Sequence, residues 1–220
     1  MNIGVLGTGV VGETIATALT QKGHNVRMGS RTATNEKAAA WVKRSNQHAT
    51  QGDFYDAAAF GDIVFLCLNG AHALDAVRMI GADAVDSKIV VDITNPLDFT
   101  KGMPPRMLDG LHNYTSLGEA IQEALPNARI VKTLNTVNCN IMVNPDLVNG
   151  GDHHMFLCGN DADAKNKVKH FLVDVFGWKA ANLIDLGGIQ YARLTEAYVP
   201  FWVGMMQSLG SPLFNIRIVQ

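Results

Sequence analysis

Cysteine is scarce in this sequence, and the cysteines that occur are far apart. There are three, Cys67, Cys139 and Cys158, an odd number without any C-x-x-C pair. A disulfide framework needs cysteines in pairs and a zinc site needs closely spaced ligands, so we expect neither. We expect no metal site of any kind, and this cysteine usage is typical of a protein of the reducing cytoplasm.

The sequence also lacks a basic run and a long apolar run. Its 220 residues include 18 Lys and Arg against 20 Asp and Glu, a formal net charge of −2. Without an excess of positive charge, we expect no binding to nucleic acid or to an anionic membrane surface. The longest apolar region, residues 199–209, is shorter than the roughly 20 residues that a membrane-spanning helix needs. The first residues do not have the pattern of a signal peptide.

Residues 1–31 have the pattern of a strand, a glycine-rich loop, a helix and a second strand. The loop has the spacing G-x-G-x-x-G, and apolar residues at helical spacing follow it until about Gly23. In dinucleotide-binding loops of this spacing, the glycines permit a tight turn, a close approach of backbone N–H groups to a pyrophosphate, and close packing of the helix. A purely structural turn is the alternative. We expect pyrophosphate binding by Gly7, Thr8, Gly9, Val10, Val11 and Gly12.

The residues after the second predicted strand indicate which dinucleotide is bound. An NAD site usually has Asp or Glu there for the ribose hydroxyls, whereas this chain continues Gly29-Ser30-Arg31-Thr32. No carboxylate is present to repel a 2′-phosphate, and the planar guanidinium of Arg31 can bind one. We therefore expect NADP as the cofactor. The alternative is that Arg31 is an ordinary solvated loop residue.

The following sequence predicts an α/β fold with a doubly wound parallel sheet of the Rossmann type. Apolar runs at residues 62–68, 89–93 and 128–134 predict buried strands. They alternate with helices predicted at residues 36–45, 54–60, 73–80 and 118–125, and such alternation is typical of right-handed β-α-β units. Residues 94–114 are expected to form a long loop. We expect residues 1–150 to be the dinucleotide-binding domain.

Residues 151–220 predict a small α/β extension of the same sheet that ends in a long apolar helix. Strands are expected at residues 154–158 and 183–186, a helix at residues 163–175, and the long helix from residue 189 to about 209, kinked at Pro200. Apolar residues cover more of this helix than the stripe of about 100° that one contact face needs. We expect a homodimer through this helix. The alternative is that the tail, residues 211–220, folds back over it.

Ligands of doubly wound sheets bind outside the carboxyl ends of the strands. By this rule we expect the cofactor to contact also Leu68, Asn69, Asn95 and Pro96. The substrate is expected beside His72, Asn135 and Val137.

Acid–base groups are few, and the sequence identifies no catalytic residue. Cys139 is expected in a loop near the nicotinamide, without a neighbour that would lower its pKa. Glu196 is expected either on a solvated helix face or as a cap of a neighbouring loop. His153 and His154 are expected on opposite faces of a strand, which argues against a shared metal. Hydride transfer to a flavin-like ring depends on orientation more than on a protein acid, so this lack favours such an acceptor.

The chain resembles the NADP oxidoreductases that depend on the deazaflavin coenzyme F420 and, more distantly, the reductase domain of six-transmembrane metalloreductases. Besides the glycine loop and Gly29-Ser30-Arg31, residues 71–75, 135–137, 157–161 and 192–196 carry the resemblance. It implies a homodimer with Ser30 and Arg31 on the 2′-phosphate of NADP and a deazaflavin near Asn69 and Asn135. In deazaflavin-using members a histidine aligns with Asn135, so the resemblance leaves the acceptor open.

Two functions are consistent with these observations. The first is an NADP(H)-dependent oxidoreductase that transfers a hydride between NADPH and a small-molecule acceptor, F420 or a flavin-like ring. The second is a non-catalytic NADP(H)-binding redox sensor. A hydroxyacid or imine dehydrogenase is disfavoured, because the chain is too short for the larger helical domain that usually carries the catalytic group.

Overall fold

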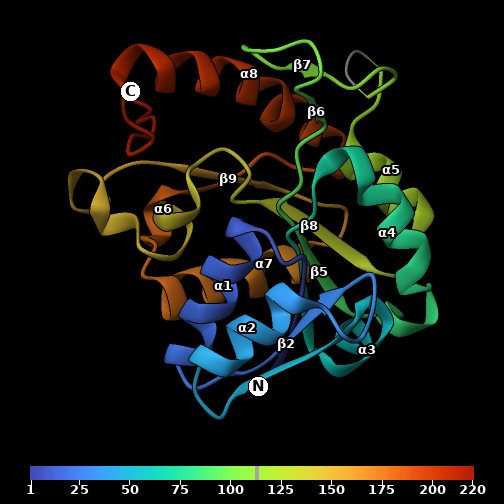
Figure 1. Cartoon of the computed structure of the whole chain (residues 1–220). Coiled ribbons are helices and arrows are strands. Elements are labelled where there is room, and N and C mark those ends of the chain that lie inside the picture. The colour runs from blue at the N-terminus through green and yellow to red at the C-terminus, as the bar shows by residue number, and fades with distance from the viewer. Residues whose placement is uncertain (112–113) are drawn as a thin grey trace.

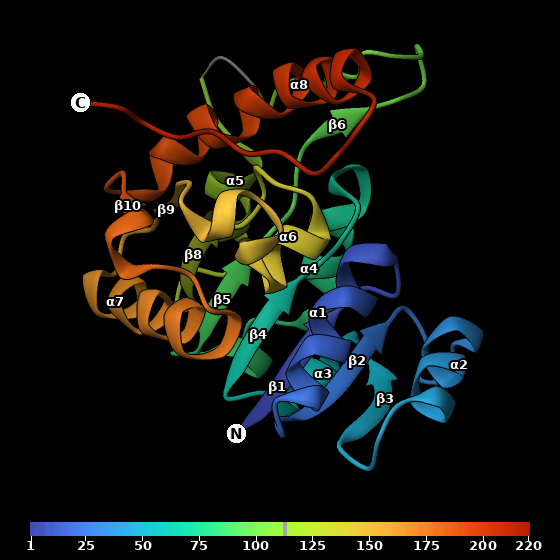
Figure 2. The same cartoon turned by 90° about the vertical axis from the view of Figure 1, so that its left-hand side faces the viewer.

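A twisted sheet runs through the centre of the molecule (Figure 1, Figure 2). The computed structural model describes residues 1–111 and 114–220, and within these it has eight strands in one sheet, in the order β10-β9-β8-β5-β4-β1-β2-β3. The pairs from β3 to β8 are parallel, whereas β9 runs antiparallel to β8. The strands are β1 (Asn2–Leu6), β2 (Asn25–Ser30), β3 (Ala49–Asp53), β4 (Ile63–Leu66), β5 (Ile89–Asp92), β8 (Arg129–Thr133), β9 (Met155–Cys158) and β10 (Leu183–Asp185).

Helices cover both faces of the sheet, as expected for a doubly wound fold. Alternate residues of the central strands serve the two faces: Ile63 and Phe65 of β4 belong to one hydrophobic cluster, and Val64 and Leu66 to the other. Because both faces are covered, these strands are continuous apolar runs. The first cluster packs against α1 (Val10–Gln21), α2 (Glu36–Arg44), α6 (Cys139–Val143) and α7 (Ala162–Phe171), and the second against α3 (Phe54–Phe60), α4 (Ala73–Ile80) and α5 (Leu117–Ala124).

Most of the predicted elements are found within a few residues of their expected bounds, but three short strands and one short α-helix were not predicted. Strand β3 is polar (ATQGD) and pairs only with β2 at the sheet edge, so it needs no apolar run. Helix α6 occupies a stretch where a loop was expected, and Cys139 begins it. The predicted loop, residues 94–114, contains the antiparallel strands β6 (Leu97–Asp98) and β7 (Arg106–Met107), while its residues 112–113 lie outside the described part of the chain.

The last long helix, α8 (Ala192–Leu209), lies beyond the sheet at the top of Figure 1. One stripe of it is buried, formed by Ala192, Thr195, Glu196, Val199 and Val203. The tail folds back, since the ring of Phe214 stacks on Trp202 at a centroid distance of 5.2 Å and His154 N donates to Ile216 O over 3.0 Å. Other apolar side chains of α8 remain exposed, namely Leu194, Phe201 and Leu209. None of the described helices is long and apolar enough to cross a membrane.

Candidate functional site

The glycine loop lies between β1 and α1, at the point where the strand order reverses. Gly7 has a φ of 126°, and a Cβ there would lie 2.3 Å from Cys67 O. A Cβ on Gly12 would lie 2.0 Å from Gly7 O, so both glycines are required by packing. Gly9 is different, because a Cβ there would meet nothing within 4 Å. Gly9 is also the N-cap residue of α1, and it has no side chain to accept a hydrogen bond from the first N–H groups of the helix. The open space at Gly9 therefore suits the pyrophosphate of a dinucleotide.

A cavity of about 600 Å³ adjoins this loop. It combines the loop glycines with the ends of β2 and β4, so sequence-predicted cofactor residues from distant parts of the chain do meet. His72, predicted beside the substrate, lines the same cavity as Arg31. Asn95, Pro96, Asn135 and Val137 do not line it. The lining residues are Gly7, Thr8, Gly9, Ser30, Arg31, Asn35, Phe54, Cys67, Leu68, Asn69, His72, Asp75, Ala76 and Met79.

The charges around this cavity favour an anionic ligand at the end of β2. Arg31 is exposed, and no residue in the described part of the chain forms an ion pair with it. Asp75, the carboxylate among the described lining residues, is paired with Arg78 at 2.6 Å. The Ser30 hydroxyl donates to Thr32 O over 2.6 Å, which holds the turn that carries Arg31. The guanidinium of Arg31 is therefore available for a phosphate.

A second part of the crevice lies beside this cavity, at the ends of β5 and β8. Asn95 Nδ2 donates to Asn135 O and Asn135 Nδ2 donates to Asn95 Oδ1, both over 2.9 Å, so the two turns are joined. Gly70 joins this pair to the cavity side, because a Cβ on Gly70 would lie 1.9 Å from Asn95 O. The buried Asn135 Oδ1 has no hydrogen-bond partner among the described residues. Val137 is buried in the core behind Asn135.

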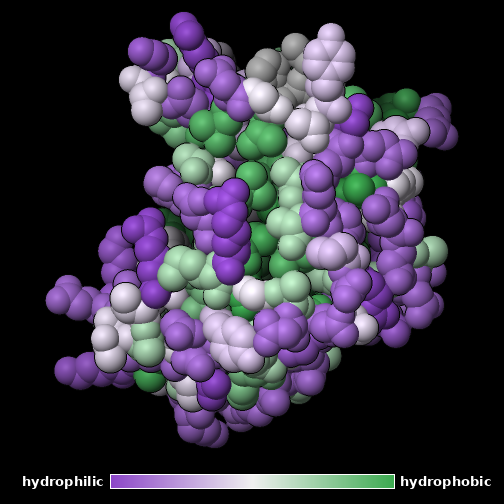
Figure 3. All heavy atoms as spheres, turned by 90° about the vertical axis from the view of Figure 1, so that its right-hand side faces the viewer, coloured by the Kyte–Doolittle hydropathy of each residue, from purple (hydrophilic) through white to green (hydrophobic). Residues whose placement is uncertain are grey.

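Seen from the right-hand side of Figure 1, the surface is hollowed below the level of α8 and the β6–β7 strands (Figure 3). Apolar side chains line the hollow, and hydrophilic ones form its borders. An apolar floor with a few polar groups at its edge is typical of sites for flat organic ligands.

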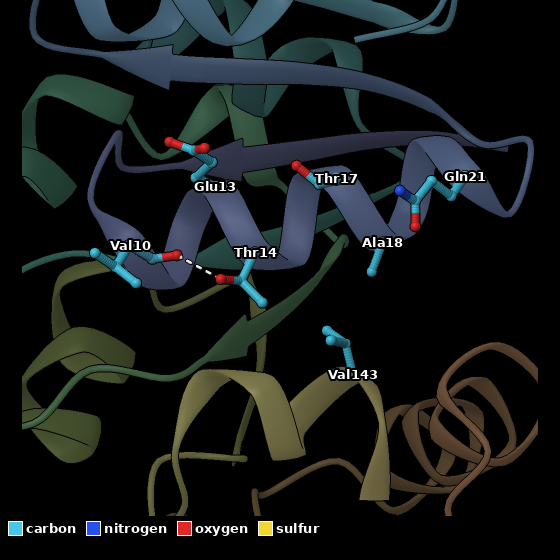
Figure 4. Close-up of a pocket in the computed structure, with 7 residues that line it drawn as sticks. All are labelled: Val10, Glu13, Thr14, Thr17, Ala18, Gln21 and Val143. Carbon is cyan, nitrogen blue, oxygen red and sulfur yellow. Dashed lines mark hydrogen bonds between the residues drawn. The ribbon is translucent and has the colours of Figure 1, made fainter. Parts of the chain in front are cut away.

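A separate groove of about 430 Å³ runs between α1 and α6 (Figure 4). Val143 of α6 lies opposite α1 there, and the Thr14 hydroxyl donates to Val10 O over 2.8 Å. The side chain of Val10 lines this groove and is not among those that line the cavity at Gly9. Val10 can therefore serve a pyrophosphate through its backbone N–H but not through its side chain.

The thiols and histidines that the sequence offered do not form a reactive site. Burial raises the pKa of the Cys67 thiol, and the Asp92 carboxylate raises it further, so Cys67 stays protonated. Cys139 is buried as a free thiol in α6. His153 Nε2 contacts Pro145 O and His154 Nδ1 accepts from Ile218 N, so the two rings have separate partners. Within the described residues, no group of three His, Cys, Asp or Glu could hold a metal ion.

Sequence reasoning missed a buried charge cluster beneath the second part of the crevice. Lys132, Asp92 and Glu196 are 0%, 0% and 1% exposed at their side chains, and Lys132 Nζ lies 2.8 Å from a carboxylate oxygen of each partner. The expectation of a solvated Glu196 is wrong, and its alternative, a capping role, is found, although the capped element is helix α5 rather than a loop. The Glu196 carboxylate accepts from the N–H groups of Leu117 and Gly118 at the start of α5. The charged residue inside each of two apolar strand runs, Asp92 and Lys132, indicated that these charges are buried, but it did not indicate that the two strands are neighbours.

Comparisons with known proteins agree with this geometry. The family described as "NADP oxidoreductase coenzyme F420-dependent" matches residues 2–96, which span β1 to the end of β5 and the turn after it. A crystal structure from Arthrobacter sp. FB24, which carries the provisional description of an F420-dependent NADP reductase, is 41% identical with a TM-score of 0.91, and 100% of both chains is covered.

More distant relatives share part of their length with this chain. Metalloreductase STEAP3 of Rattus norvegicus is 25% identical over 205 residues, which are 91% of this chain but only 37% of that protein. The chain thus spans little more than a third of this curated relative. A reductive aminase from Aspergillus terreus, solved with NADPH, has the same fold at 18% identity and a TM-score of 0.63, covering 95% of this chain and 61% of the other.

The different surroundings of Gly9 and Gly12 predict opposite phenotypes for the same substitution. Gly9→Ala should leave the melting temperature unchanged, because its methyl group enters open space. It should weaken dinucleotide binding about tenfold or more, since overpacking costs about 1–3 kcal/mol. Gly12→Ala should lower the unfolding free energy by about 1–3 kcal/mol, because its methyl group meets the Gly7 carbonyl. Calorimetry and thermal melts measure both, and a destabilised Gly9→Ala with normal binding would contradict the assignment.

Proposed function

Because this chain belongs to the family of coenzyme F420-dependent NADP oxidoreductases, and is thereby an NADP-dependent oxidoreductase, we propose that it transfers a hydride between NADPH and a deazaflavin or flavin-like acceptor. The observation that carries the proposal is the cavity that combines the open space at Gly9 with the unpaired guanidinium of Arg31. The two features match the pyrophosphate and the 2′-phosphate of NADP.

The residues of this chain have distinct tasks in holding the cofactor. The open space at Gly9 and the first turn of α1 receive the pyrophosphate, and Arg31 binds the 2′-phosphate. Ala76 and Met79 of α4 offer an apolar wall to the adenine. His72 shares this cavity with Arg31, so we assign it to the adenosine half of the cofactor rather than to the acceptor. NADPH, when bound, supplies the hydride.

The acceptor end of the site lies by our proposal along the turns that carry Asn69, Asn95 and Asn135. These side chains are uncharged, and a carboxylate substrate would call for an arginine clamp. Asn135 Oδ1 is buried, so by our proposal Asn135 acts through the shape of the turn that it holds against Asn95. In the reaction, the oxidised acceptor takes up a hydride from NADPH and a proton from water, which leaves NADP⁺ and the reduced acceptor. Asn135 positions the ring and transfers no proton.

The cofactor assignment predicts that the native protein binds NADPH much more tightly than NADH. A charge-assisted hydrogen bond contributes about 1.5–3 kcal/mol, so Arg31→Ala should weaken NADPH binding about ten- to a hundredfold and leave NADH binding nearly unchanged. Arg217→Ala, which removes an exposed arginine paired with Asp152, is the matched control and should change neither. Titration by calorimetry decides, and equal native affinities for NADPH and NADH would refute the assignment.

The acceptor is tested by following NADPH oxidation with a panel of deazaflavin, FMN, FAD, quinones and ferric chelates. We expect turnover with a deazaflavin or flavin. With that acceptor Asn135→Ala should raise its KM far more than it lowers kcat, because only binding is lost. A large fall in kcat at unchanged KM would make Asn135 a transition-state group. If NADPH binds tightly and every oxidant fails, the protein is instead an NADP(H)-binding redox sensor.

We also propose that the chain forms a homodimer through α8. The tail covers Trp202, but Leu194, Phe201 and Leu209 remain exposed on this helix. Light scattering should give twice the chain mass of 23.8 kDa at micromolar concentrations. Phe201→Asp should shift the protein to the monomer, whereas Phe99→Asp, at an equally exposed residue near β6, should not. A native protein that stays monomeric would disprove this assembly.

A further inference from the structure

Lys132 uses all three hydrogens of its ammonium group inside the protein. Nζ donates to Asp92 Oδ2 over 2.8 Å and to Thr94 O over 2.7 Å, and it lies 2.8 Å from Glu196 Oε1. Asp92 and Lys132 are register partners on the neighbouring strands β5 and β8. An ammonium group has three donors and no acceptor, so Lys132 is fully satisfied without water.

Each partner of Lys132 holds another part of the backbone. Asp92 Oδ1 accepts from Thr94 N over 2.8 Å and from Thr94 Oγ1 over 2.6 Å. Glu196 brings in α8 and accepts from the first N–H groups of α5, at Leu117 and Gly118. The missing side chain of Gly118 permits this approach, because a Cβ there would lie 3.1 Å from Lys132 Cδ. One ammonium group thus connects two strands, two helices and the turn after β5.

Stability alone is a weak reason for such a network. Burial opposes the charge of Lys132, but the carboxylates of Asp92 and Glu196 more than offset this and raise its pKa. Burial also raises the pKa of Glu196, which Lys132 only partly counteracts. Replacing buried ion pairs by apolar residues is often neutral or stabilising, so charges retained here point to a positional task.

The network ends at the crevice. Thr94, held at its carbonyl, its N–H and its hydroxyl, directly precedes Asn95, which is joined to Asn135 and packs against Gly70. Leu134, between Lys132 and Asn135, has a φ of 63°, a conformation that persists only where the surroundings enforce it. The Lys132 network therefore holds the two turns beside the nicotinamide end of the proposed site in place.

We propose that Lys132 is a positioning residue that holds the turn of residues 94–96 in place as a wall of the nicotinamide site, and that Glu196 ties this wall to α8. The inference rests on the proposed function, because it assumes that NADPH lies along the crevice. It makes a specific statement about the two halves of the cofactor. The adenosine half lies on β1, β2 and α4, which the network does not touch, whereas the nicotinamide half depends on it.

The experiment compares two ligands, NADPH and 2′-phospho-ADP-ribose, which lacks the nicotinamide, by calorimetry. Lys132→Met should weaken NADPH about tenfold, the equivalent of one charge-assisted hydrogen bond, and leave the fragment within about twofold. At saturating NADPH, the emission of the bound dihydronicotinamide should shift towards that of the free cofactor. Lys132→Met/Asp92→Asn/Glu196→Gln leaves no uncompensated charge and retains amide acceptors for Thr94 and α5, so it provides a folded variant if the single substitution unfolds the protein.

Lys165→Met is the matched control. Lys165 is also buried, with Nζ 2.8 Å from Asp185 Oδ1 and 3.0 Å from Gly187 O, but it lies on α7 next to the far edge of the sheet. The Lys165→Met substitution should lower the melting temperature and leave the affinities for NADPH and 2′-phospho-ADP-ribose unchanged. Equal weakening of both ligands by the Lys132 variants, or no weakening of either, would overturn the inference. If the native protein binds neither ligand, the proposed function itself fails and this inference with it.

Discussion

The ammonium group of Lys132, enclosed by the protein oxygen atoms that it contacts, is the interaction on which the second half of the molecule depends. It forms ion pairs with two carboxylates that come from strand β5 and helix α8, and one of these carboxylates in turn caps helix α5. Removing Lys132 leaves uncompensated negative charge in the interior, a cost of about 3–5 kcal/mol. The order of the strands, the start of α5 and the position of α8 are therefore bound together.

The two halves of the crevice are built by different physical means. At β1 and β4, the crevice is shaped by close packing. Because Gly7 and Gly12 lack side chains, the glycine loop, α1 and Cys67 can approach one another within contact distance. At β5 and β8, the crevice is shaped by hydrogen bonds, those of the Asn95–Asn135 pair and those of the buried Lys132 cluster. In the proposed binding mode, the first half presents backbone N–H groups and Arg31, which has no ion-pair partner among the described residues, to the phosphates of NADP, and the second presents neutral amides to the nicotinamide.

The proposed reaction between two ring systems needs no protein acid–base pair, and the described residues that line the cavity offer no reactive thiol. Cys67, the thiol nearest the glycine loop, is held protonated by burial and by the charge of Asp92. The ionisable groups of the buried cluster are occupied by one another and do not reach the cavity. In the proposed hydride transfer, the protein's contribution is the relative placement of two ring systems, which depends on rigid walls rather than on a proton donor.

The sequence by itself determined the features that depend on neighbours along the chain. The fold was identified by the glycine spacing, the apolar strand runs and the helical periods. The loop glycines and the lack of a carboxylate after β2 indicated the residues around Gly9 and Arg31. The edge strand β3 and the short helix α6 were not predicted, because neither needs a distinctive apolar pattern. Only the tertiary structure decided that Glu196 is buried, that His72 lies with Arg31, and that Asn135 faces Asn95. These facts depend on strand β5 lying beside strand β8, although Asp92 and Lys132 are 40 residues apart along the chain. They also depend on α8 packing back against these two strands. No local sequence pattern contains that information.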